Sequence, residues 1–398
     1  MEKALKYNFS VASEREGTNA EKYVLREELF GTDDVLPAWV ADMDIDTPQF
    51  VLDAVKKRLE HSIIGYEEVP QSAFTAQIAW MRNEHGISFR LEDMFYSHSV
   101  VASMHTAIEA ITKEGEGVIV QTPVYPPFFN SVLQLNRKLI KNSLYVNTEG
   151  RYSFDIEDLK SKIDENAKLL LLCSPHNPVG RVWHKEELEE ILAVCIEHNI
   201  VVFADEIHSD LVYRPYKHTP FASLSEEAKN ITVTAIGPGK TFNMAGFAMS
   251  TVAIQNKELK EQFKTAYDKI HFAQGSSLSH VAFETAYKEG KEWLEALKKH
   301  LYENYKKLEV VAKKYPQYIK VTPIEATYLA WIDCRGMDLK DKNLRAFFIN
   351  EAKLGLNPGI GFGREGSGFI RLNFAVSSAK MTEIVQRLER ALQRRQIG

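Results

Sequence analysis

Three polar residues in this chain, Asn177, Asp205 and Lys240, each follow an apolar run that is typical of a buried strand. Because open parallel sheets bind ligands beyond the carboxyl ends of their strands, we expect the three side chains to meet at one rim of a sheet. A lysine amine can act there as a nucleophile or a base, and a carboxylate can stabilise a cationic partner. The pattern therefore predicts a site where an amide, a carboxylate and an amine converge.

Each of these residues also has a purely structural interpretation. Asn177 and Pro178, with Gly180, could form only a turn, since Asn favours turn conformations and Pro fixes φ. Asp205 could cap a following helix, and Lys240 could be a solvated loop residue. The coincidence of all three at successive strand ends favours the ligand site.

Two glycine-rich stretches match nucleotide-binding patterns incompletely. GPGKT at 237–241 ends like a P-loop, but Thr234 stands where that pattern requires its first glycine. GFGREG at 361–366 is followed by a strand-like run, whereas a dinucleotide fingerprint needs a helix there. The histidines lack the HExxH spacing or any other metal-ligand spacing, so we expect no metal site.

The three residues belong to a longer alternation of apolar runs with helical patterns such as KEELEEILAVCIEHN at 185–199. Unbroken apolar runs separated by helices indicate a mostly parallel sheet that helices cover on both faces. The predicted fold class is therefore α/β, with a doubly wound sheet in a large domain at 46–287. The expected strands lie at 94–100, 117–123, 168–175, 200–207, 230–238 and 250–255.

The pattern changes near residue 288. A long charged helix is expected at 293–315, and strand candidates follow at 326–334 and 368–376, which is an α+β layout. We assign residues 288–398 to a second, smaller domain, which the N-terminal segment 1–45 joins.

The composition limits the partners. The 398 residues carry a formal net charge of −5 with acids and bases interspersed, so neither nucleic acid nor an anionic membrane surface is an expected partner. No run is apolar enough to cross a membrane, and the amino terminus lacks the apolar core of a signal peptide. Three scattered cysteines suit a reducing compartment, so we expect a cytoplasmic protein.

Several longer motifs add a resemblance to a known family. SPHNPVGRVW (174–183), ADEIHSDL (204–211), GKTFNMAG (239–246) and FIRLNFA (369–375) resemble the cofactor and substrate motifs of class I/II aminotransferases, which are fold type I enzymes that use pyridoxal 5′-phosphate (PLP). LPAWVADMDI (36–45), IIGY (63–66), TPVYPPFF (122–129) and GFGREGSGF (361–369) are similar to the cystathionine β-lyase and cystalysin branch of carbon–sulfur lyases. The resemblance covers nearly the whole chain.

The resemblance implies roles around the PLP ring. Lys240 would carry PLP as a Schiff base and then remove the substrate Cα proton. Asp205 would keep the pyridine nitrogen protonated, Asn177 would donate to the phenolic oxygen, and Tyr125 would stack on the ring. Lys240, Asp205 and Tyr125 are thus the expected catalytic residues. His208 stands where transaminases often have a tyrosine, and its role is left open.

Further residues would bind the phosphate and the substrate. The backbone of Val101 and Ala102, at a helix start, would bind the phosphate, with Tyr66 reaching in from a neighbouring subunit. Arg371 would clamp the substrate α-carboxylate with its planar fork. One departure from the branch is Gly239, where a serine hydroxyl usually contributes to phosphate binding.

The leading interpretation is a homodimer with shared active sites that cleaves L-cystathionine, L-cysteine or related S-substituted cysteines to a thiol or sulfide, pyruvate and ammonia. An aminotransferase that uses the same residues is the nearest alternative. A regulatory protein that uses this fold only for binding is a remote one. Whether activity needs a 2-oxo acid as amino acceptor distinguishes the first two.

Overall fold

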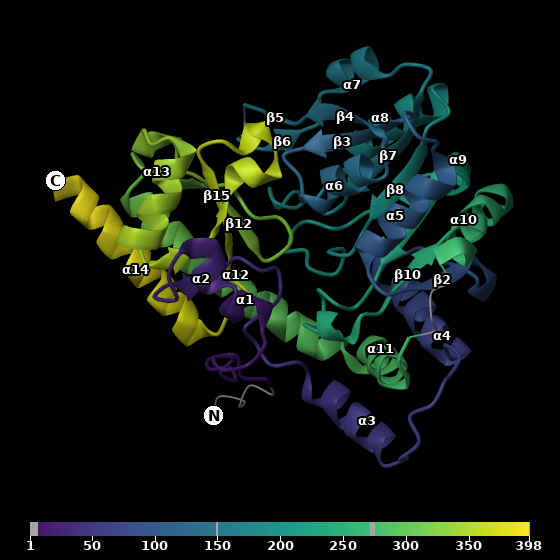
Figure 1. Cartoon of the computed structure of the whole chain (residues 1–398), viewed down its shortest axis with the longest axis horizontal. Coiled ribbons are helices and arrows are strands. Elements are labelled where there is room, and N and C mark those ends of the chain that lie inside the picture. The colour runs from purple at the N-terminus through teal and green to yellow at the C-terminus, as the bar shows by residue number, and fades with distance from the viewer. Residues whose placement is uncertain (1–6, 149, 271–274, 398) are drawn as a thin grey trace.

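The computed structural model describes residues 7–148, 150–270 and 275–397, and its largest element is a seven-stranded sheet (Figure 1). The strands follow the order β2-β10-β9-β8-β7-β3-β4. All neighbouring pairs are parallel except the two that involve β10, which runs antiparallel to β2 and to β9. The bounds are β2 Met94–Ser97, β3 Gly117–Thr122, β4 Lys138–Ser143, β7 Ala167–Cys173, β8 Val201–Asp205, β9 Thr232–Ile236 and β10 Ser250–Ala253.

Helices pack on both faces of this sheet because its central strands are apolar on both sides. In β7, Leu169 and Leu171 face one way and join a core with helices α5, α6 and α10. Leu170 and Leu172 face the other way and join a core with α7 and α8. The bounds are α5 Val100–Ile111, α6 Pro127–Gln134, α7 Ile156–Lys162, α8 Lys185–Glu197, α9 Glu226–Ile231 and α10 Lys257–Ile270. This arrangement confirms the predicted α/β class with a doubly wound, mostly parallel sheet.

A smaller antiparallel sheet, in the order β11-β12-β15-β14, lies beside the larger one (Figure 1). The strands β12 and β15 correspond to the strand candidates at 326–334 and 368–376. The long helix α12 corresponds to the helix expected at 293–315. The bounds are β11 Lys320–Val321, β12 Leu329–Asp333, β14 Asn357–Pro358, β15 Phe369–Asn373, α11 Ser277–Glu289, α12 Lys291–Lys314, α13 Asp341–Ala346 and α14 Ser378–Ile397.

The N-terminal segment is attached to the C-terminal part of the chain, where β1 and β13 form a separate two-stranded sheet. Its strand β1 pairs with β13 in parallel, and Asp44 forms a bridge with Val376. The segment that includes Asp44, residues 38–45, forms no helix or strand and is called the strap below. The bounds of the remaining elements are α1 Glu21–Val24, α2 Arg26–Phe30, β1 Leu36–Pro37, α3 Gln49–Leu59, α4 Gln71–Trp80, β5 Tyr145–Val146, β6 Tyr152–Ser153 and β13 Leu354–Gly355.

A buried group of charged side chains fastens the strap, and we call it the Asp44 cluster. The carboxylate of Asp44 lies 2.9 Å from Arg15, 3.2 Å from Lys22 and 3.0 Å from Lys380, and it accepts a hydrogen bond from Tyr23. Burial alone would raise the pKa of Asp44, but the ammonium groups of Lys22 and Lys380 outweigh it and lower the pKa. The cluster joins the N-terminal segment to α14.

Two features of the sheets were not expected from the sequence. The edge strand β4, KLIKNS, alternates polar and apolar residues and lacks the unbroken apolar run that marked the other strands. The antiparallel direction of β10 also carries no local sequence signal.

Among the described residues, no helix is both long and apolar enough to cross a membrane.

Candidate active site

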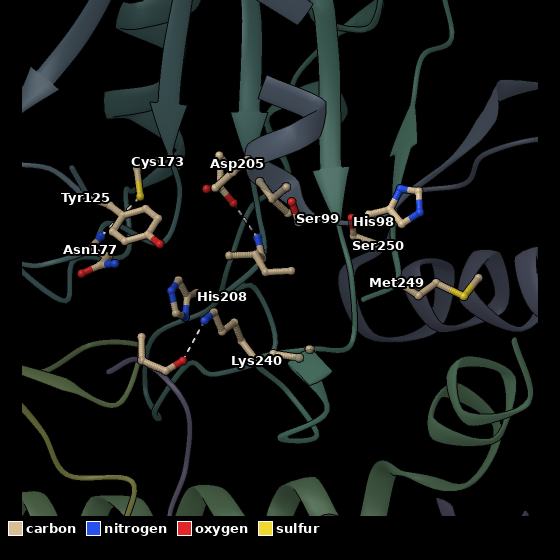
Figure 2. Close-up of a pocket in the computed structure, with 16 residues that line it drawn as sticks. His98, Ser99, Tyr125, Cys173, Asn177, Asp205, His208, Lys240, Met249 and Ser250 are labelled. Atoms are coloured by element: carbon tan, nitrogen blue, oxygen red, sulfur yellow. Dashed lines mark hydrogen bonds between the residues drawn. The ribbon is translucent and has the colours of Figure 1, made fainter. Parts of the chain in front are cut away.

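A pocket of about 860 Å³ opens where the strands of the larger sheet end, and Figure 2 shows the side chains that line it. Six of the predicted site residues line it, and they come from the ends of β7, β8 and β9, from the start of α5 and from the loop after β3. These six are Val101, Tyr125, Asn177, Asp205, His208 and Lys240.

Lys240 lies in the turn after β9, and its side chain reaches back across the pocket. Its Nζ donates a hydrogen bond of 2.7 Å to the carbonyl oxygen of Ala41 in the strap. Burial lowers the pKa of Lys240 to about 8, although the carboxylate of Asp42 opposes this shift. A substantial fraction of the amine is therefore neutral near physiological pH and can act as a nucleophile or a base.

Asp205 is the last residue of β8, and its carboxylate is only 6% exposed. One oxygen accepts the backbone N–H of Ile207 at 3.1 Å. Among the described residues, no lysine, arginine or histidine nitrogen forms an ion pair with Asp205. Burial raises the pKa of this carboxyl to about 7. A buried acid that forms no ion pair with a described residue is suited to bind a cationic ligand group.

Asn177 and Tyr125 line the pocket, and Arg371, which does not line it, is hydrogen-bonded to Asn177 behind them. The backbone N–H of Tyr125 donates to the Asn177 carbonyl, and Nη1 of Arg371 donates to Asn177 Oδ1 at 3.1 Å. Arg371 thus fixes which end of the Asn177 amide faces it: Oδ1 accepts this bond, and Nδ2 takes no part in it. Arg371 also donates to the Trp39 carbonyl and to Asn357, and burial lowers the pKa of its guanidinium to about 10. The buried Nε of Arg371 has no acceptor among the described residues.

The first turn of α5 faces the pocket with Val100 and Val101. The backbone amides of these two residues have no acceptor within the described part of the chain, as is usual for the first N–H groups of a helix. The Ala102 amide, in contrast, donates to the side chain of the N-cap residue Ser99 at 3.1 Å. In this turn the amides of Val100 and Val101, and not the predicted Ala102 amide, are therefore available to an acceptor in the pocket.

His208 lies between Asp205 and Lys240 in Figure 2. Burial lowers the pKa of its imidazole to about 3, so the ring is neutral. Its Nδ1 is buried and has no hydrogen-bond partner in the described chain. Tyr66, in contrast, contributes nothing to this pocket within its own chain, since it is fully exposed.

Sequence reasoning missed the part that the strap plays in the site. Its carbonyl groups accept hydrogen bonds from side chains of both sheets: Trp39 from Arg371, Ala41 from Lys240, and Val40 and Asp42 from Asn373. A buried segment outside regular secondary structure must satisfy its carbonyl groups in some such way. The only sequence signal in the strap is the motif LPAWVADMD, which indicates the family resemblance but predicts none of these contacts.

Comparison with known proteins agrees with this geometry. The family model described as aminotransferase class I and II matches residues 40–388. The chain belongs to this family. A cystathionine beta-lyase of Bacillus subtilis, PatB, is 37% identical over 97% of this chain and all of its own length.

Solved structures of other members have the same fold. Cystalysin from Treponema denticola, whose structure contains a pyridoxal 5′-phosphate cofactor, is 34% identical, with a TM-score of 0.94 over 98% of this chain and 100% of its own. The PLP-bound C–S lyase from Staphylococcus hominis is 32% identical, with a TM-score of 0.90 over 98% of this chain and 99% of its own. The predicted membership of the class I/II aminotransferase family, and the similarity to its C–S lyase branch, are confirmed.

Proposed function

We propose that this protein is a PLP-dependent C–S β-lyase that acts on L-cystathionine, L-cysteine or related S-substituted cysteines. One observation carries the proposal. The buried Asp205 carboxylate, which forms no ion pair with a described residue, lines the same pocket as the Lys240 amine. The similarity to a cystathionine beta-lyase over the whole chain supports the choice of reaction.

The residues of the pocket fit PLP. The Asp205 carboxylate suits the protonated pyridine nitrogen, and Asn177 Nδ2 can donate to the phenolic oxygen while its Oδ1 is held by Arg371. The ring of Tyr125 offers an apolar face for stacking, and the free amides of Val100 and Val101 suit the phosphate. When bound to Lys240, PLP supplies an electron sink for the charge that develops at the substrate Cα.

The protein groups then have separate tasks. Arg371 would bind the substrate α-carboxylate, because its fork is already aimed by the Trp39 carbonyl and by Asn357. The neutral amine of Lys240 would take the Cα proton, since its lowered pKa leaves it partly unprotonated. The apolar surroundings exclude water and strengthen the field of Asp205. Loss of the thiol from Cβ and addition of water would yield pyruvate and ammonia.

An assay without added 2-oxo acid tests the reaction class. Purified protein is incubated with L-cystathionine or L-cysteine, and pyruvate and ammonia are measured, with the Lys240→Ala protein as control. Equal amounts of pyruvate and ammonia, absent from the control, are expected. Turnover that requires a 2-oxo acid would instead establish an aminotransferase. No turnover in either assay would favour a binding protein.

We also propose that the working unit is a homodimer in which Tyr66 serves the neighbouring active site. The stretch around Tyr66 leaves large apolar side chains uncovered, with Ile63 68% and Ile64 52% exposed. Such a patch in a single chain suits an interface with a second copy. A tyrosine in an interface can donate its hydroxyl to an anion while its ring is buried.

Complementation tests the shared site. Inactive Lys240→Ala and impaired Tyr66→Ala chains are mixed after mild dissociation. If the sites are shared, each hybrid dimer contains one site with both defects and one intact site, so activity returns. A mixture that stays inactive would refute the shared site.

We retain two further predictions as proposals. The chain would divide into a large domain at 46–287 and a small domain at 288–398 joined by residues 1–45, which the pairing of β1 with β13 and the bridge from Asp44 to Val376 support. A cytoplasmic location suits the three buried cysteines, all of which are free thiols. Limited proteolysis and cell fractionation test these two points.

A further inference from the structure

The carbonyl oxygen of Ala41 accepts two side-chain donors at once. Nζ of Lys240 lies 2.7 Å from it and Oη of Tyr328 lies 2.8 Å from it. Ala41 belongs to the strap and lines the pocket, whereas Tyr328 directly precedes β12 of the smaller sheet. The lysine of the active site and a residue of the smaller sheet therefore meet at one backbone oxygen, the acceptor of the dashed bond from Lys240 in Figure 2.

Tyr328 is a firmly held donor. Its side chain is 0% exposed, and its backbone carbonyl accepts the N–H of Phe374. The edge of its ring packs against the imidazole of His208, with centroids 6.0 Å apart. Burial raises the pKa of the phenol well above its ordinary value, so the hydroxyl is protonated at neutral pH.

The kind of acceptor matters for the lysine. A carbonyl oxygen can only accept a hydrogen bond, so the amine contributes an N–H to Ala41 and not its lone pair. When the amine is neutral, its lone pair is left outside this bond and is available to the pocket. A carboxylate in the same place would instead favour the charged ammonium.

We propose that Tyr328 is a positioning residue for Lys240. Its hydroxyl fixes the Ala41 carbonyl, and this carbonyl holds the lysine amine with its lone pair free whenever the amine is not bound to PLP. The assignment rests on the proposed function only in giving Lys240 the role of base, since the contacts are those of the cofactor-free chain.

The hydroxyl also affects the charge on the lysine. It presents its hydrogen, the positive end of the O–H dipole, to the oxygen that the amine binds. A positive end at this position disfavours the ammonium form. Removal of the hydroxyl therefore raises the pKa of Lys240 and leaves less neutral amine at neutral pH.

Labelling of the cofactor-free protein tests the proposal without any catalytic assay. Wild type and Tyr328→Phe are treated with a trace of acetic anhydride over a series of pH values, and acetylation of Lys240 is measured by peptide mass spectrometry. The midpoint for Lys240 should move up by about half a pH unit in Tyr328→Phe, as expected for the loss of one hydrogen bond. An unchanged midpoint would overturn the proposal.

Tyr213→Phe is the matched control. Tyr213 is buried like Tyr328, and its hydroxyl donates at 2.7 Å to the carbonyl of Thr327, the residue before Tyr328. The substitution removes the same type of bond from the same segment without touching Ala41. In Tyr213→Phe, the pH midpoint for acetylation of Lys240 should equal that of wild type. An equal shift in both variants would show that mere loosening of the segment is responsible, and would also overturn the proposal.

Two further measurements complete the test. In the PLP-loaded Tyr328→Phe protein, exchange of the substrate Cα proton with deuterated solvent should slow about tenfold, while KM changes little because Arg371 is intact. If that variant does not fold, a crystal structure of wild type with PLP and an amino-acid analogue decides: Nζ within hydrogen-bond distance of the Ala41 carbonyl supports the proposal, and any other position refutes it. A lack of pyruvate formation by wild type would refute the lyase but leave a labelling shift standing.

Discussion

Asp205 and Asp44 are both buried carboxylates, but their surroundings are opposite. Asp44 is 2% exposed and is surrounded by Arg15, Lys22 and Lys380, which lower its pKa. Asp205 forms no ion pair with a described residue, and burial raises its pKa to about 7. The first carboxylate is satisfied by the fold itself. The second has no ion-pair partner in the described part of the chain and can accept one from a ligand, which distinguishes a binding site from a structural ion cluster.

The largest expected effect on stability concerns the satisfied carboxylate. Asp44→Asn should lower the free energy of unfolding by about 3 kcal/mol, because Lys380 loses its carboxylate partner and the fully buried Lys22 keeps only the Asp42 carboxylate, 2.9 Å away. Denaturant titration at pH 7 measures this loss. A loss below about 1 kcal/mol would show that the cluster is no more important than a surface ion pair.

The same substitution at the unsatisfied carboxylate should affect turnover. Asp205→Asn should bind PLP but lose at least about 100-fold in kcat, because an amide cannot keep the ring nitrogen protonated. Absorbance of the bound cofactor and steady-state assays measure the two properties separately. Near-normal turnover would mean that Asp205 only caps the turn to Ile207.

Without cofactor, Asp205→Asn should have the opposite effect on stability from Asp44→Asn. It removes a buried, unpaired charge, so the cofactor-free variant should be more stable than wild type by about 1–3 kcal/mol at pH 8. The pKa of Asp205 is raised in the folded state. Wild type is therefore not destabilised by the buried charge below about pH 4, where the carboxyl is protonated, and is fully destabilised by it above about pH 7. The difference between the proteins should therefore grow from pH 4 to pH 7. A constant difference would show that charge is not its cause.

The smallest effect is expected from adding a partner to the pocket. A Cβ atom at Gly239 would meet nothing closer than 3.4 Å, so Gly239→Ser fits without displacing its neighbours. Its hydroxyl can donate to the phosphate, and one such bond contributes about 1 kcal/mol. PLP should therefore leave the variant several-fold more slowly during dialysis. Gly239→Ala is the control, and an equal gain in both variants would argue against a hydroxyl contact.

The difference between these regions also explains what could be foreseen from the sequence. Asn177, Asp205 and Lys240 were predicted because each lies at or shortly after the end of a strand, and strand ends of a parallel sheet gather at one edge. The contacts of the strap and of the Asp44 cluster have no such rule. Lys240 reaches Ala41 across 199 positions and Tyr328 reaches it across 287, so no local pattern records either contact.

The strap has a consequence for the order in which the molecule is made. Residues 38–45 leave the ribosome early, yet Tyr328, Arg371, Asn373 and Lys380, which hold them, are translated near the end. The larger sheet, with its lysine and its phosphate-binding turn, can assemble before these partners exist, since its last strand ends at Ala253. In a nascent chain, the pocket of the larger sheet could thus form first. The strap would be fixed beside it only after the C-terminal residues that hold the strap have been translated.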